Sequence, residues 1–162
     1  MGSRYADCDD AIEDWLAYGR YRARVMSHLR GQYGRAGLIR LREALLAMPE
    51  RKLAQGVVVL NGECCAIGAL AIHQHVQASG LSWDAAAIVV QAEIGTDYQD
   101  RLVSEDVGVQ HGLDALAASE VAYVNDEECY YRTQEERWQD MVDWIDTLLA
   151  GGAGKLSTVG PL

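Results

Sequence analysis

An amphipathic segment near the carboxyl end of the chain most strongly constrains what this sequence can fold into. Apolar side chains recur there at helical spacing, and they are Trp138, Met141, Val142, Ile145, Leu148 and Leu149. Thr133 precedes the segment and Glu136 follows three residues later, which is the spacing of a capping box. The pattern predicts a helix with one apolar face, and such a face has to pack against other elements.

Similar spacings predict that most of the remaining chain is helical. Apolar residues recur every three or four positions in several stretches, which are residues 9–30, 36–48, 66–78, 83–94 and 113–124. Glycine or proline stands at the ends of most of these stretches and favours helix termination there. Residues 96–112 show no clear period, and we expect a long surface connection with at most one helical turn.

One short run departs from the helical pattern. Residues 57–60 read Val-Val-Val-Leu, which favours a strand, and Asn61-Gly62 follows at once. This dipeptide accepts the positive φ angles of a type I′ turn, so residues 63–65 are expected to return as a second strand. The expected fold class is therefore mainly α with a minor β component: five to six packed helices and one short hairpin near residues 57–65.

The length of the chain predicts one domain, and its lack of apolar or leader-like segments predicts that this domain lies in the cytoplasm. A chain of 162 residues can bury one core, so we expect a single helical domain over residues 1–150 and a flexible tail over 151–162. No apolar run approaches the roughly 18 residues of a membrane-spanning helix. The first residues lack the basic-then-apolar order of a signal peptide. These observations predict a cytoplasmic protein of a bacterial cell that does not enter the membrane.

The charge of the chain is −10, and it is unevenly distributed. Residues 19–52, a basic arm, carry a net charge of +7, whereas residues from 56 onward, which include an acidic body over 56–150, carry −13. This balance disfavours nucleic acid as a partner and favours protein partners or pairing between the two regions. The candidate partner-binding residues are Arg20, Arg24, Arg30, Arg35, Asp126, Glu127 and Glu128.

Two adjacent cysteines suggest an alternative, catalytic interpretation. Cys64 and Cys65 stand where the hairpin meets a predicted helix, and a helix N-terminus lowers the pKa of a thiol. Cys65 could then act as the nucleophile of a small papain-like thiol enzyme, with His111 as base and Asn125 orienting it. We favour the simpler interpretation, in which both cysteines are small buried core residues. The four cysteines are expected to be free thiols.

No metal or cofactor is predicted. His73 and His75 are two residues apart, so a helix directs their side chains to different sides. The acidic run at 125–128 lacks the alternating carboxylates and the glycine of a calcium-binding loop. We therefore expect residues 125–128 to end the preceding helix in a turn formed by the Asn or Asp side chain.

Three motifs, in this order along the chain, resemble those of a known group of proteins. They are Leu41-Arg42-Glu43-Ala44-Leu45 with Gln55-Gly56 after it, then Gly62-Glu63-Cys64-Cys65-Ala66-Ile67-Gly68-Ala69-Leu70, and finally Val124-Asn125-Asp126-Glu127 before the helix that Thr133 opens. Over residues 42–149, about two thirds of the chain, the sequence resembles a group of small proteins encoded by tailed phages and prophages. The group has no agreed activity, so the resemblance implies which kind of genome encodes the chain and implies no function for it.

Together these observations favour a binding protein over an enzyme. The expected function is that of a non-enzymatic accessory protein of a phage or other mobile element, which acts by protein–protein interaction. Its acidic surface would contact a host protein, for example as an inhibitor of a CRISPR defence system. Self-association is also expected, because a basic arm and an acidic body can attract each other between copies.

Overall fold

The chain is built from helices and one two-stranded hairpin. We describe it from a computed structural model that covers residues 6–96 and 99–151, without the side chains of residues 6–12 and 101. Within these ranges there are seven α-helices and one π-helical segment, with bounds α1 Ala6–Arg30, α2 Gln32–Ala47, α3 Ala66–Ser79, α4 Trp83–Ile94, α5 Arg101–Gln110, α6 Ala115–Tyr123, η1 Val124–Glu128 and α7 Gln134–Leu149. The mainly α fold class with minor β is confirmed. The predicted tail, apart from its first residue, and the side chain of Cys8 lie outside the described residues.

The hairpin forms at the predicted place. Strands β1 (Val59–Leu60) and β2 (Glu63–Cys64) pair in antiparallel fashion. Asn61 and Gly62 have φ angles of 51° and 83°, as the Asn-Gly signal predicted. The strands are shorter than expected: the Cys65 N–H still donates to the Val58 carbonyl at 3.1 Å, but α3 begins at the next residue and ends the pairing.

The Gln99 side chain occupies the position of a third strand beside β1. Its Oε1 accepts hydrogen bonds from the backbone N–H groups of Val58 and Val59 at 2.9 and 3.0 Å, and its Nε2 donates to the Val59 carbonyl at 2.8 Å. Two paired strands are rarely stable alone. Gln99 therefore satisfies an edge that the short hairpin leaves open.

Helix α3 lies at the centre of the molecule. It contacts α2, α4, α5 and α6, and all seven residues from Ala66 to Ile72 are buried. Gly68 on this helix faces the hairpin so closely that an added Cβ would lie 2.9 Å from the carbonyl carbon of Val58 and overlap its oxygen. The predicted end of the helix is confirmed: Gly80 adopts the left-handed conformation at its C-terminus, with φ of 70°.

The expectation of an irregular connection over residues 96–112 is wrong, because Arg101–Gln110 forms α5. Asp100 caps this helix by accepting a hydrogen bond from the Val103 N–H at 3.0 Å. Its inner face includes the buried Ser104 and Gly108, besides Val107. Because the buried face includes a polar residue and a glycine, the spacing of apolar residues alone does not show the helical repeat.

The expected helix stop at residues 125–128 is also wrong. Val124–Glu128 continues α6 as a π-helical turn, η1, which turns Asn125 into the core. The Asn125 side chain accepts a hydrogen bond from the N–H of Ala66 and donates one to the carbonyl of Ala54, at 3.2 and 3.0 Å. The amide therefore connects the start of α3 to the segment before the hairpin.

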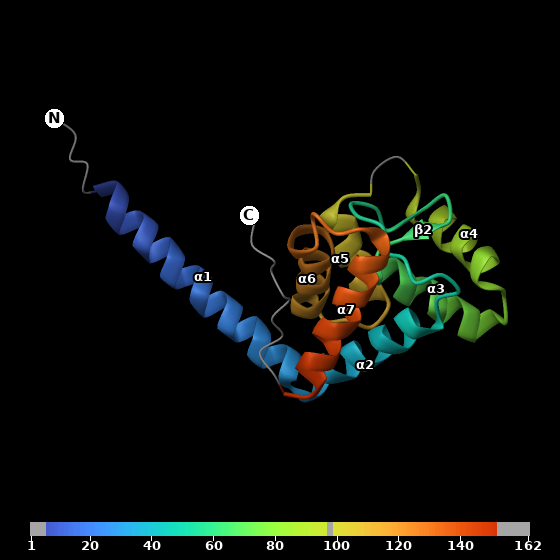
Figure 1. The fold of residues 1–162 in the computed structure, drawn as a ribbon, viewed down its shortest axis with the longest axis horizontal. Helices are drawn as coiled ribbons and strands as arrows, with labels where there is room; N and C mark the ends of the chain where they lie inside the picture. The colour runs from blue at the N-terminus through green and yellow to red at the C-terminus, as the bar shows by residue number, and fades with distance from the viewer. Residues whose placement is uncertain (1–5, 97–98, 152–162) are drawn as a thin grey trace.

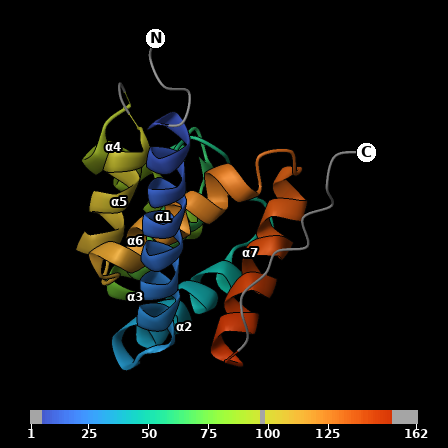
Figure 2. The same ribbon diagram turned by 90° about the vertical axis from the view of Figure 1, so that its left-hand side faces the viewer.

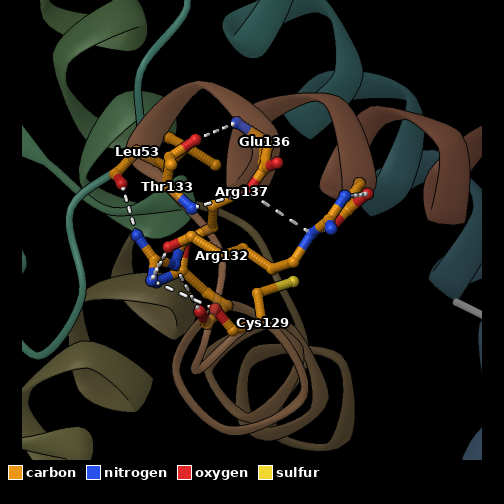
Figure 3. A network of polar contacts seen from close by, with 8 residues as sticks. Leu53, Cys129, Arg132, Thr133, Glu136 and Arg137 are labelled. Carbon is orange, nitrogen blue, oxygen red and sulfur yellow. Dashed lines mark hydrogen bonds and ion pairs between the residues drawn. The ribbon is translucent and has the colours of Figure 1, made fainter. Parts of the chain in front are cut away.

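Arg137 is the buried residue that joins η1 to α7. Its guanidinium donates hydrogen bonds to four backbone carbonyls, which belong to Leu53, Asn125, Cys129 and Arg132. Figure 3 shows the side chain reaching from the first turn of α7 toward these oxygens, beside the predicted capping box of Thr133 and Glu136, which is confirmed. The side chain is only 3% exposed, so its charge is stabilised by carbonyl dipoles.

The corner between α1 and α2 needs a glycine. An added Cβ on Gly34 would overlap the carbonyl oxygen of His28 and lie 2.6 Å from Cα of Leu29. Such spacing brings the first turn of α2 directly against the last turns of α1. Among the described helices, none is both long and apolar enough to span a membrane.

Candidate functional site

The second half of α1 is anchored to the rest of the protein. Val25 and Leu29 are fully buried in the core, and α1 contacts α2 and α6. Arg22 forms an ion pair with Glu120, which is itself buried on α6. Burial lowers the pKa of Arg22, but the hydrogen bond and charge of Glu120 outweigh it and raise the pKa above its ordinary value. This end of α1 is part of the core.

The first half of α1 extends away from the core. Residues 13–20, which we call the free half of α1, are all exposed to solvent, and Figure 1 shows this part of the helix projecting beyond the other helices. In Figure 2, turned by 90°, α1 stands in front of them. Trp15 is 76% exposed, Leu16 56% and Tyr18 49%. Single exposed apolar residues are common, but Trp15 and Tyr18 stand three residues apart on one side of the helix and form an apolar surface patch. Leu16 is two residues from Tyr18 and so points to another side of the helix.

A small hollow marks the point where α1 leaves the core. It has a volume of about 160 Å³ and is lined by Tyr18, Tyr21, Arg22, Glu120 and Tyr123. The Arg22 guanidinium lies 5.6 Å from the centre of the Tyr123 ring. Burial, together with a hydrogen bond between the Tyr123 and Tyr18 hydroxyl groups, raises the pKa of Tyr123. The hollow therefore combines aromatic rings with a charged pair, next to the exposed Trp15.

The predicted binding arginines fall into two groups. Arg20, Arg24 and Arg30 are exposed along α1, and the Arg24 guanidinium lies 5.8 Å from the centre of the Tyr21 ring. Arg35 instead lies on α2 and donates a hydrogen bond to the Leu149 carbonyl at 2.8 Å, at the end of α7. The structure does not gather these four side chains into one patch.

Residues 31–52 of the basic arm pack within the protein. Arg40 donates to the Gly112 carbonyl, and Arg42 forms an ion pair with Asp146 of α7. Several basic side chains of residues 19–52 thus bind acidic or carbonyl groups of the acidic body, which agrees with the expected pairing between the two regions. On α1, Arg20 and Arg24 are exposed.

The predicted acidic binding residues take separate roles. Asp126 accepts a hydrogen bond from the Gly56 N–H at 3.1 Å. Glu128 lies 3.6 Å from Arg22 in an ion pair, and burial raises the pKa of its carboxyl group. Glu127 is exposed. Among the described residues, no cluster of three or more His, Cys, Asp or Glu side chains could hold a metal ion.

The cysteine pair lies in the core rather than at a surface. Cys65 is 4% exposed and precedes α3, where its sulfur accepts a hydrogen bond from the Gly68 N–H at 3.4 Å. Burial raises the pKa of the Cys65 thiol to about 11, and it raises that of Cys64 further. A thiol in this state remains protonated near neutral pH, so the sulfur acts as a helix cap and not as an activated nucleophile.

His111 lies apart from Cys65. Its Nδ1 is 2.8 Å from the side-chain oxygen of Gln74, and its ring centre is 6.1 Å from that of His75. Gln74 stands nine residues beyond Cys65 on α3, which corresponds to roughly 13 Å along the helix axis. Asn125 bonds to Ala54 and Ala66, as described above. The structure therefore does not bring the three residues of the alternative thiol site together.

This arrangement predicts that the described thiols are unreactive in the native protein. In a Cys8→Ser variant, we expect Cys64, Cys65 and Cys129 to react with iodoacetamide at pH 8 only as fast as the protein unfolds, since all three are buried. The measurement is mass-spectrometric labelling with and without urea. Rapid labelling of Cys65 in the absence of urea would favour the thiol-enzyme interpretation.

We compared the chain with known families, curated proteins and solved structures. No family model, no curated protein and no solved structure shows significant similarity to it. The surface that stands out is therefore defined by geometry alone: the free half of α1 with the hollow at its base. Sequence reasoning singled out Arg20 there but did not name Trp15, Leu16 and Tyr18, because they share one predicted helix, over residues 9–30, with the apolar residues that enter the core.

Proposed function

We propose that this chain is a non-enzymatic protein-binding module and that the free half of α1 is its contact element. The observation that carries the proposal is the exposure of Trp15, Leu16 and Tyr18 on a helical segment that projects beyond the rest of the protein. The adjoining hollow offers a polar rim of Arg22 and Glu120. An aromatic anchor with a polar rim is the usual composition of a protein–protein contact.

The energetics of a projecting helix support this proposal. Isolated helices shorter than about 12–15 residues are marginal in water, and most helices in proteins gain their stability from packing an apolar face. Within the part of the chain that the structure describes, all residues from 13 to 20 are exposed, and Tyr18 meets the core at its hydrogen bond with Tyr123. A partner that covers Trp15 would bury roughly 150–250 Å² of that side chain and would also stabilise the helix.

A site-specific cross-linking experiment tests the proposal. A photoreactive phenylalanine analogue is placed at position 15 of the full chain, which is expressed in the cells that produce it. The matched control carries the same analogue at position 88, because Ile88 is 72% exposed on α4. We expect discrete protein adducts from position 15 and few from position 88, identified by mass spectrometry.

The result that contradicts the proposal is equally clear. Equal cross-linking from positions 15 and 88 would mean that the free half of α1 is no preferred contact.

An adduct from position 15 that disappears on Leu16→Gln, while circular dichroism is unchanged, would assign the contact to the free half of α1. Contacts with a charged rim should weaken as salt is raised, because screening reduces attraction between exposed charges.

A narrower form of the proposal concerns the setting in which the protein works. The resemblance to phage and prophage proteins, the small size and the charge of −10 are the features that support an accessory role for a mobile element in the bacterial cytoplasm. An acidic protein of this kind could bind a host protein that normally holds nucleic acid, as an anti-CRISPR inhibitor does. Identification of the position-15 adduct as a host defence protein would support this narrower proposal.

A further inference from the structure

A second cavity lies where the hairpin, the start of α4 and the segment after α2 meet. Its volume is about 440 Å³, whereas that of the hollow beside α1 is about 160 Å³, and the two are lined by different residues. Sites for small molecules commonly have volumes of roughly 300–1,000 Å³. The contact that we propose on α1 makes no use of this cavity, so its lining asks for an explanation of its own.

Three carboxylates line the cavity, and each comes from a different segment. Glu50 follows α2, Glu63 opens β2 and Asp84 stands in the first turn of α4. Among the described residues of the lining, the one cation is Lys52. Its Nζ lies 3.4 Å from a carboxylate oxygen of Glu50 and 3.8 Å from one of Glu135. Three carboxylates and one ammonium group give the lining a net charge of −2, which attracts cations.

Two helix ends reach the same cavity and oppose this charge only in part. Helix α4 begins at Trp83 and α7 begins at Gln134, and both residues belong to the lining. Each helix N-terminus is equivalent to roughly half a positive charge. Asp84 lies in the first turn of α4, and Glu135 and Glu136 lie in that of α7. The lining therefore remains negative when both helix ends are included.

Trp83 gives the cavity an aromatic wall. Its side chain is partly buried and packs against the core, so the ring is held in place. Ammonium groups are attracted to the face of an indole ring. Beside it, Gln134 positions Glu63, because its Nε2 donates a hydrogen bond to Glu63 Oε1 at 3.1 Å. A carboxylate has about four acceptor sites, so Glu63 can also accept hydrogen bonds from a ligand.

We propose that this cavity binds an organic cation that carries two or more ammonium groups on a flexible alkyl chain. The carboxylates of Glu50, Glu63 and Asp84 accept hydrogen bonds from the ammonium groups, and the alkyl chain lies against Trp83 and Met48. A free polyamine and the lysine side chains of a peptide share this chemistry. The inference is independent of the protein contact proposed on α1.

Titration of the full chain with spermidine tests the inference, and the dipeptide acetyl-lysyl-lysine amide is the second probe. Heteronuclear NMR at constant ionic strength follows the indole N–H of Trp83 and the backbone N–H groups of Glu63 and Asp84. We expect these signals to shift in a saturable way, with a dissociation constant below about 1 mM, the weak end of specific affinity. The probe that binds more tightly identifies the source as a polyamine or a basic peptide.

Two substitutions should change the affinity for the tighter probe in opposite directions. Glu63→Gln removes a carboxylate and should raise the dissociation constant by about threefold, the effect of one exposed charge pair. Lys52→Gln removes a competing ammonium group and should lower it. Trp83→Leu keeps an apolar wall without an aromatic face, so it should also weaken binding. Circular dichroism checks that each variant is folded.

The control is Glu43→Gln, an equal loss of charge at an exposed position of α2, which should leave the dissociation constant unchanged. Equal weakening by Glu43→Gln and Glu63→Gln overturns the inference, because the probe would then respond to the total charge of −10 and not to the cavity. The absence of saturable shifts below about 1 mM of either probe also overturns it. So does saturation of the same signals by inorganic phosphate, with Lys52→Gln weakening the binding, since the cavity would then be an anion site.

Discussion

Replacing Gly68 by alanine is expected to destabilise the protein by about 4 kcal/mol or more, the range of the most damaging single substitutions. The added methyl group would overlap the carbonyl oxygen of Val58, which accepts the hydrogen bond of the Cys65 N–H at 3.1 Å. A backbone oxygen cannot rotate out of the way as a side chain can. The hairpin would have to separate from α3, and urea unfolding followed by circular dichroism measures the loss.

Gly19→Ala provides the matched control for this substitution. Both glycines lie inside helices, but Gly19 has open space around it. We expect Gly19→Ala to stabilise the chain by up to about 1 kcal/mol, since alanine favours the helix. The two variants should thus differ in sign. A Gly68→Ala protein as stable as the wild type would show that the hairpin does not contact α3 as described.

Replacing Arg137 by leucine is expected to cost about 3–5 kcal/mol, the usual loss when a buried charged group is removed from its partners. The guanidinium donates to four carbonyls, and two of them belong to Asn125 of η1 and to Cys129, the residue after η1. Leucine fills part of the volume but removes the guanidinium donors. The Cys129 carbonyl keeps the Arg132 N–H as a donor at 3.1 Å, whereas each buried oxygen that is left unpaired costs about 1–3 kcal/mol. Equilibrium unfolding in urea tests this expectation.

Arg132→Leu is the control for Arg137, because it removes an arginine five residues earlier with a different environment. Arg132 pairs with Asp140 at 2.6 Å, and both side chains are partly exposed. Exposed ion pairs contribute about 0–1 kcal/mol, so we expect a small loss. Equal losses for the two variants would contradict the structural role assigned to Arg137.

The elements that sequence reasoning predicted correctly are those with local causes. The capping box of Thr133, the Asn-Gly turn and the glycine that ends α3 each depend on a few neighbouring residues. Residues 101–110 and 125–128 were misassigned for a different reason. The inner face of α5 includes Ser104 and Gly108, and the turn of η1 depends on distant partners such as Ala54.

The candidate surface was only partly predictable for a similar reason. Charge counts identified Arg20 and Arg24, but they do not say where α1 parts from the core. The apolar residues on either side of that point look alike in sequence: Trp15 and Tyr18 continue toward Val25 and Leu29 at helical spacing. Trp15 and Tyr18 are exposed whereas Val25 and Leu29 are fully buried, and this difference comes from tertiary packing, which no local pattern contains.

The glycine corner between α1 and α2 affects the direction in which the projecting helix points. Gly34 holds the last turns of α1 against α2, and Trp15 stands fourteen residues before Leu29, roughly 21 Å along the axis. A change of 10° (about 0.17 rad) at that corner would move Trp15 by about 4 Å, over half a helical turn. The direction of the contact face therefore depends on residues outside that face: Gly34 at the corner, and Arg22, whose ion pair with Glu120 holds α1 against α6.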